Sequence, residues 1–179
     1  MKIKLMIFAI LLMSLNSKAD GILISLGANT LEGMTQEKFE SAKKWKKDQI
    51  IEKNLSVDNW PETYLLLVAS NNCNKKIVDL LIEQLGDTNQ TKLKNTNRLI
   101  IWERILSGDI MFEGKGMQIE DDLFSVSGRA NWILRNITEK NFGYVKPSST
   151  MEDLKQLKDK WLKWSNDEDV EEYQNPYES

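Results

Sequence analysis

Apolar residues at helical spacing constrain the fold of this 179-residue chain more than any other feature. The clearest case is near the C-terminus, where Leu154, Leu157, Trp161 and Trp164 follow one another at intervals of three or four residues. Such a stripe lies along one face of an α-helix and buries that face against a core. The segment is therefore predicted to be an amphipathic helix, with Ser149 and Glu152 as its capping box.

The same pattern recurs along the chain and predicts about six helices. Thr35 and Asn74 are suitable N-caps, Pro61 fits a first helical turn, and Gly86 fits the left-handed position after a helix end. The helices are expected at about 36–54, 58–70, 75–85, 95–107, 122–138 and 150–165. Short connections make successive helices antiparallel neighbours. The predicted class is all-α, and the pattern leaves two architectures open, an irregular α-α superhelix and a closed helical bundle.

The N-terminus is expected to be a signal peptide over residues 1–19. Lys2 and Lys4 precede an apolar run over 5–15, and small residues stand at Ser17 and Ala19. This arrangement is typical of a secretory leader, and the run is about half as long as a membrane-spanning helix. Cleavage near Ala19 predicts a periplasmic or secreted chain. Membrane anchoring by this segment is the alternative, so contact with a membrane is expected to be peripheral at most.

The rest of the chain is expected to form one helical domain over 20–165, followed by an acidic tail over 166–179. The tail carries many acids and no apolar face, so it is expected to be disordered in isolation. Within 20–26, the short apolar run Ile22–Leu26 is expected to be a strand or an extended arm. Removal of the leader leaves 21 basic and 27 acidic residues, a net charge of −6. This balance argues against a nucleic-acid partner.

The composition excludes several classes of catalytic site. The chain has no histidine and one cysteine, Cys73, which excludes Ser-His-Asp triads, histidine-ligated metals and thiolate zinc clusters. The sequence Gly114-Lys115-Gly116 lacks the spacing of a phosphate-binding loop. No cofactor is expected, and Cys73 is expected to be a packed thiol.

Four carboxylates between the fourth and fifth predicted helices leave three interpretations open. Asp121 or Asp122 is expected to cap the fifth helix, with Glu113 and Glu120 solvated. Calcium binding is a second interpretation, although the spacing does not match an EF-hand loop. Catalysis is the third, in which Glu113 and Glu120 or Asp121 cleave a glycosidic bond.

The tryptophans and charged side chains on the predicted helices are expected to have structural roles. Trp102, Trp132, Trp161 and Trp164 have aliphatic neighbours at helical spacing and are assigned to the core, with a ligand groove as the alternative. Trp45 and Trp60 are candidates for exposed anchors. Arg129 lies on an apolar face and is expected to pair with Asp121, Asp122 or Glu103. The four lysines Lys43, Lys44, Lys46 and Lys47 are expected to form a solvated face, with a binding patch as the alternative.

The segment 110–119 is the strongest candidate for a binding surface. Apolar residues flank Gly114-Lys115-Gly116 on both sides, which suggests a short β-hairpin with this tripeptide at its tip. A connection this long between packed helices is usually functional or folded over the core, and both alternatives stay open. The predicted partner-binding residues are Met111, Phe112, Glu113, Lys115, Met117, Glu120 and Asp121.

Part of the chain resembles HEAT-type helical repeats. The residues that carry the resemblance lie within 74–164: Asp121-Asp122 near a helix start, Arg129-Ala130 further on, Ile137-Thr138, Phe142-Gly143-Tyr144, and Trp161 with Trp164. The resemblance implies a superhelix that presents ridged or concave surfaces to other proteins. The chain departs from the pattern at 109–121, where a regular repeat has a short turn, and it shows no clean repeat period.

Together these features predict an exported, non-enzymatic protein that binds another protein. An immunity-type inhibitor of a secreted bacterial toxin fits a small, acidic chain without catalytic motifs. The alternatives are a carboxylate-dependent hydrolase of cell-wall glycan and a structural subunit of envelope assembly.

Overall fold

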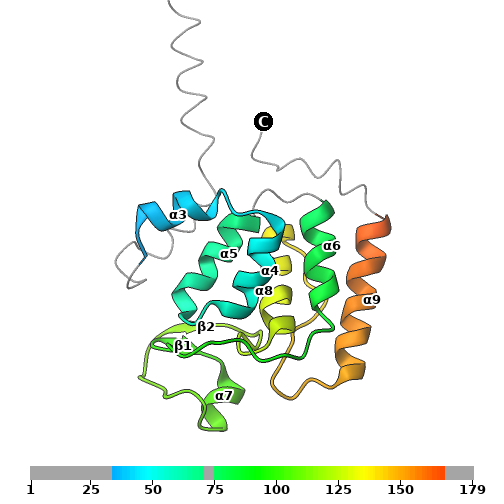
Figure 1. The fold of residues 1–179 in the computed structure, drawn as a ribbon. Helices are drawn as coiled ribbons and strands as arrows, with labels where there is room; N and C mark the ends of the chain where they lie inside the picture. Colours follow the sequence, from blue (N-terminus) through cyan, green and yellow to red (C-terminus); the bar gives the residue numbers. More distant parts are fainter. Residues whose placement is uncertain (1–33, 71–74, 168–179) are drawn as a thin grey trace, which may run out of the picture.

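The computed structural model describes residues 34–70 and 75–167, and these residues fold as the predicted all-α class (Figure 1). The predictions for the leader, for Ile22–Leu26, for Cys73 and for residues 168–179 lie outside the described residues. In chain order the elements are α3 (Gln36–Ala42), α4 (Lys47–Ser56), the 3-10 helix η1 (Trp60–Glu62), α5 (Thr63–Ser70), α6 (Lys75–Gln84), β1 (Leu99–Ile100), α7 (Trp102–Leu106), β2 (Met117–Gln118), α8 (Val126–Thr138) and α9 (Met151–Asp167).

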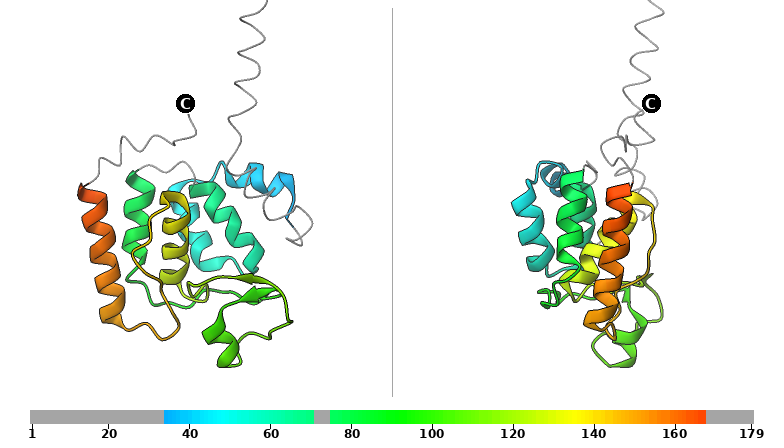
Figure 2. Two further views of the ribbon diagram at one scale, coloured as in Figure 1. Left: turned by 180° about the vertical axis from the view of Figure 1, so that it is seen from behind. Right: turned by 90° about the vertical axis from the view of Figure 1, so that its right-hand side faces the viewer.

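Helix α8 occupies the centre of the helical part. It packs against α4, α5 and α6, and α9 lies along the other side of α6 (Figure 2). Ala130, Ile133 and Leu134 of α8 are fully buried in the shared core. The stripe predicted on α9 is confirmed, since its two leucines and two tryptophans are all buried.

The single helix predicted over 36–54 is wrong, because the chain breaks between α3 and α4. Phe39 and Ala42 of α3 pack with Leu65 and Val68 of α5 in a small separate cluster, whereas Ile50 of α4 enters the main core. Because these apolar residues pack into two different clusters, the segment forms two helices with a break between them. Lys46 takes an extended conformation at the break, and its N–H donates to Gln49 Oε1 at 2.9 Å.

Trp60, a candidate for an exposed anchor, is a core residue in the structure. Its side chain is 3% exposed, its indole N–H donates to the carbonyl of Asn97, and its ring meets the edge of Tyr64. Pro61 stands in the first turn of η1, as predicted. The segment that follows, α5, is buried along its whole length, which agrees with its uniformly apolar sequence.

The helix predicted at 95–107 is also wrong, since only residues 102–106 are helical. Leu99, Ile100 and Ile101 are three consecutive buried residues, and an extended strand followed by the turn into α7 buries them all. Arg98 has a positive φ of 60°, which ends any helix approaching from its N-terminal side. Trp102 consequently begins α7 and is exposed, contrary to its assignment to the core.

The segment 110–119 contains a strand but not the expected hairpin. Its strand β2 pairs with β1 in parallel, with Leu99 opposite Met117 and Ile100 opposite Gln118. The bonds Met117 N–H to Arg98 O at 2.7 Å and Ile119 N–H to Ile100 O at 2.9 Å hold this pairing. The partner of β2 is therefore β1, whereas a hairpin would pair it with residues 110–112.

Three predicted helix ends differ in the structure. Helix α8 begins at Val126 and is capped by the Ser125 hydroxyl, which accepts from Gly128 N–H at 3.1 Å, so neither Asp121 nor Asp122 is the cap. The capping box of α9 is shifted by one residue to Thr150 and Asp153. Gly86 follows α6 as predicted but has no positive φ.

Candidate functional site

Residues 102–116, here called the α7 lobe, project from one end of the helical part (Figure 1). The lobe consists of α7 and the connection that leads to β2. Ile110 anchors it from within, since this side chain is 3% exposed and belongs to the main core. The β1–β2 pairing fixes both ends of the lobe to the domain.

The lobe exposes four large apolar side chains. Leu106 and Met111 are 84% and 83% exposed, and Trp102 and Phe112 are 47% and 45% exposed. The rings of Trp102 and Phe112 contact each other with their centroids 5.3 Å apart, so α7 and the following connection pack together here. Soluble proteins seldom gather large apolar residues on a surface, and such patches mark sites of interaction.

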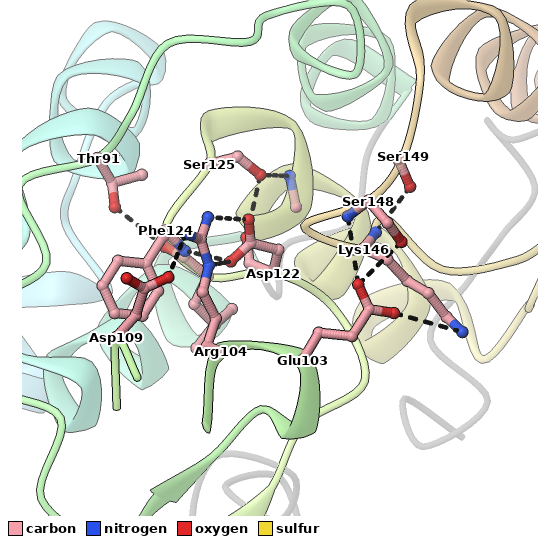
Figure 3. A network of polar contacts seen from close by, with 12 residues as sticks. Thr91, Glu103, Arg104, Asp109, Asp122, Phe124, Ser125, Lys146, Ser148 and Ser149 are labelled. Atoms are coloured by element: carbon pink, nitrogen blue, oxygen red, sulfur yellow. Dashed lines mark hydrogen bonds and ion pairs between the residues drawn. The ribbon is translucent and has the colours of Figure 1, made fainter. Parts of the chain in front are cut away.

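A charged network ties the base of the lobe to the start of α8 (Figure 3). Arg104 of α7 donates from Nε and Nη2 to the two carboxylate oxygens of Asp122, at 3.1 Å and 2.7 Å, and from Nη1 to Asp109 at 2.9 Å. Hydrogen bonding to Asp122 is the main cause that raises the pKa of Arg104, and hydrogen bonding to Arg104 lowers the pKa of Asp109. This two-pronged contact fixes the orientation of α7.

A second contact joins the lobe to the loop before α9. Glu103 Oε2 accepts hydrogen bonds from the backbone N–H and the hydroxyl of Ser148, at 3.2 Å and 2.8 Å (Figure 3). Lys146 Nζ lies 3.8 Å from the other oxygen of the same carboxylate. The lobe is therefore oriented by polar contacts on two sides, while its apolar residues stay uncovered.

Asp121 belongs to a separate, internal network. Its carboxylate is 0% exposed and accepts from Arg135 Nη1 at 2.5 Å, Asn131 Nδ2 at 2.7 Å and Val145 N–H at 2.9 Å. Asn131 also accepts from the indole N–H of Trp161, which extends the network to α9. Burial raises the pKa of Asp121 above its ordinary value, against the opposing effect of these donors. The network crosslinks α8, α9 and the loop between them.

The buried Arg129 has partners other than the predicted carboxylates. Its guanidinium is 0% exposed and donates to the backbone carbonyls of Leu123, Asn54 and Val57, at 2.8 Å, 3.0 Å and 2.8 Å. Desolvation lowers the pKa of Arg129 to about 10. The side chain thus satisfies two carbonyls at the end of α4, and it shares the Leu123 carbonyl before α8 with the Thr91 hydroxyl, which donates to it at 3.0 Å.

The seven predicted partner-binding residues do not form one surface. Met111, Phe112, Glu113, Lys115 and Glu120 are exposed on or next to the lobe, Met117 is half-buried against the core, and Asp121 is buried. Asp121 is therefore excluded from any contact surface. Sequence reasoning missed Trp102 and Leu106, because the apolar spacing of 99–106 was interpreted as a core-facing helix.

The described residues contain no group of three or more histidine, cysteine or acidic side chains that is arranged to hold a metal ion. A shallow groove beside α3 is lined by Lys38, Trp45, Glu62 and Leu65, among other residues. Lys38 and Glu62 neutralise each other there at 2.7 Å. The α7 lobe therefore stands out as the candidate functional site.

None of the helices in 34–70 or 75–167 has the length and apolar character of a membrane span. In comparisons with known proteins, no family model, no curated protein and no solved structure matches this chain.

Proposed function

We propose that this protein is an exported, non-enzymatic domain that binds another protein through the α7 lobe. The supporting observation is the exposure of Trp102, Leu106, Met111 and Phe112 on one projecting lobe that polar contacts orient from two sides. Aromatic and methionine side chains are enriched in the centres of protein interfaces. Within this class we favour an immunity-type inhibitor of a secreted bacterial toxin, on the basis of the chain's small size, acidity and leader-like N-terminus.

The burial of Asp121 weighs against the alternative of a hydrolase that uses Asp121 with Glu113. A catalytic carboxylate must reach its substrate, and Asp121 is enclosed by three internal donors. The remaining pair, Glu113 and Glu120, is exposed. If the double variant Glu113→Gln, Glu120→Gln lost a lytic activity that the native chain possesses, the non-enzymatic proposal would be overturned.

Affinity purification of the tagged chain from its native host tests the proposal. We expect one protein to co-purify with the native chain and to be lost with the triple variant Trp102→Ser, Met111→Ser, Phe112→Ser. The matched control is Met151→Ser with Leu162→Ser, since these residues are exposed on α9 at 62% and 38%. Retention of the partner by the lobe variant, or recovery of the native chain alone, contradicts the proposal.

Two further measurements test the finer parts of the proposal. For export, we expect the N-terminus of the chain recovered from the periplasm or medium to be Asp20. For inhibition, we expect the co-purified protein to be toxic when produced without this chain and harmless when the two are produced together. If the co-purified protein were not toxic, the proposal of a protein-binding domain would stand, and the proposal of an immunity role would be rejected.

A further inference from the structure

Lysines gather at the end of the molecule opposite the α7 lobe. The connection between α3 and α4, the start of α6 and the end of α9 all lie at this end, in every view (Figures 1 and 2). We call the group the lysine end, and its members are Lys43, Lys44, Lys46, Lys47, Lys75, Lys76 and Lys163.

A direct contact joins two parts of the lysine end. Lys75, the first residue of α6, donates from Nζ to the hydroxyl and the backbone carbonyl of Ser165, at 3.0 Å and 3.3 Å. Ser165 stands two residues before the end of α9 at Asp167. The chain therefore leaves α9 immediately beside the start of α6.

Most of the charge at the lysine end is not neutralised within the described part of the chain. Lys43 pairs with Glu40 at 2.8 Å, and Lys75 pairs with Asp79 at 3.2 Å. The other five lysines are exposed, and no ion pair involves them among residues 34–70 and 75–167. The first turn of α4 also contains one acid, Asp48. A surplus of positive charge on one face attracts an acidic segment.

The chain itself supplies such a segment at this point. Five of the six residues from Asp167 to Glu172 are acidic. We propose that residues 167–172 dock on the lysine end of the same molecule. Each residue beyond Asp167 extends the reach of the chain by at most about 3.3–3.6 Å, so residues 168–172 cannot lie farther than about 18 Å from the end of α9, which stands beside the start of α6. The tether makes the contact intramolecular and raises its effective concentration.

This contact gives the lysine end a defined occupant. Docking of the acidic segment neutralises a positive face on a domain without net charge of its own, since residues 20–166 carry 21 basic and 21 acidic residues. Any other anionic partner of this face must then displace residues 167–172. The inference does not depend on the binding role of the α7 lobe, which lies at the other end of the molecule (Figure 1).

Limited acetylation of lysine amines, read by mass spectrometry, tests the docking. The full mature chain is compared with the variant Glu168→Gln, Asp169→Asn, Glu171→Gln, Glu172→Gln. We expect Lys44, Lys46, Lys47 and Lys76 to react about two- to fivefold faster in the variant, because exposed ion pairs are individually weak. Lys92 and Lys115, at the opposite end, are the internal controls and are expected to react at the same rate in both chains.

The salt dependence of the acetylation rates supplies a second measurement. At about 1 M NaCl the Debye length falls to about 3 Å, so the native chain is expected to react at the rate of the variant. Equal rates in both chains at low salt, or an equal slowing of Lys92 and Lys115, overturn the docking. Slowing that grows with protein concentration also overturns it, since the segment then binds a second copy of the chain.

Discussion

The start of α8 and the α7 lobe lie next to each other but differ in which kinds of side chain they bury and which they expose. Around α8 the charged groups of Arg129 and Asp121 are buried, and their hydrogen bonds are made within the domain. In the lobe the charged groups face outward or hold its base, and the large apolar side chains of Leu106 and Met111 are exposed. The comparison teaches that burial of charge marks the structural centre of this protein, while exposure of apolar groups marks its candidate working surface.

The largest expected effect comes from Arg129→Met. This change removes the donor of the buried carbonyls of Asn54 and Val57, whereas Leu123 O keeps its bond from Thr91. Unsatisfied buried groups cost about 1–3 kcal/mol each, so we expect a loss on the order of 4 kcal/mol in the free energy of unfolding. Chemical denaturation measures it. Arg129→Lys is also expected to destabilise, because a single ammonium cannot reach all three carbonyls. Arg98→Met is the exposed control, and a similar loss there would refute the structural role given to Arg129.

Two glycines, Gly128 in α8 and Gly116 in the α7 lobe, allow the same two regions to be compared through their backbone packing. A Cβ at Gly128 would lie 2.0 Å from Asp122 O, so Gly128→Ala is expected to cost about 3 kcal/mol, although alanine favours helices. At Gly116 a Cβ would lie 2.3 Å from Arg98 O, and we expect Gly116→Ala to loosen the α7 lobe while the helices stay folded. Hydrogen exchange distinguishes local from global loss. Gly86→Ala is the control, since its nearest atom is Lys158 Nζ at 4.0 Å.

The burial of Tyr64 leads us to expect that the free energy of unfolding falls at alkaline pH. Burial raises the pKa of Tyr64 from 10.0 to about 12, so the folded state keeps a proton that the unfolded state loses. The contribution is present below pH 10 and is lost as the pH rises toward 12, by on the order of 2 kcal/mol. Unfolding measured across this range is expected to show a shallower decline for Tyr64→Phe. Identical slopes for the two chains would contradict the prediction.

The smallest effect on stability is expected in the lobe. Trp102→Ser and Met111→Ser remove exposed side chains and should change the free energy of unfolding by less than about 0.5 kcal/mol. Trp161→Leu, in contrast, is expected to cost about 3 kcal/mol, because Trp161 is fully buried and donates to Asn131. Thermal denaturation of the three variants measures the contrast. Strong destabilisation by the lobe substitutions would mean that these side chains stabilise the fold, which would contradict their assignment to a binding surface.

Local patterns in the sequence determined the helical class and the strongest helices. The stripes of α6, α8 and α9 were predictable, because a spacing of three and four residues fixes one face of a helix whatever it packs against. The exposed glycine segment was also identified as the candidate surface. These features depend on neighbours within a few residues of one another.

Tertiary structure alone decided the features that depend on distant partners. The break between α3 and α4 follows from two separate packing targets, and the extended strand β1 follows from the burial of three consecutive residues beneath the lobe. Trp60 is buried because Asn97 accepts its N–H and Tyr64 meets its ring, whereas Trp102 starts a short helix at the surface. The sequence determined which residues are apolar, and the three-dimensional packing decided which of them the core could cover.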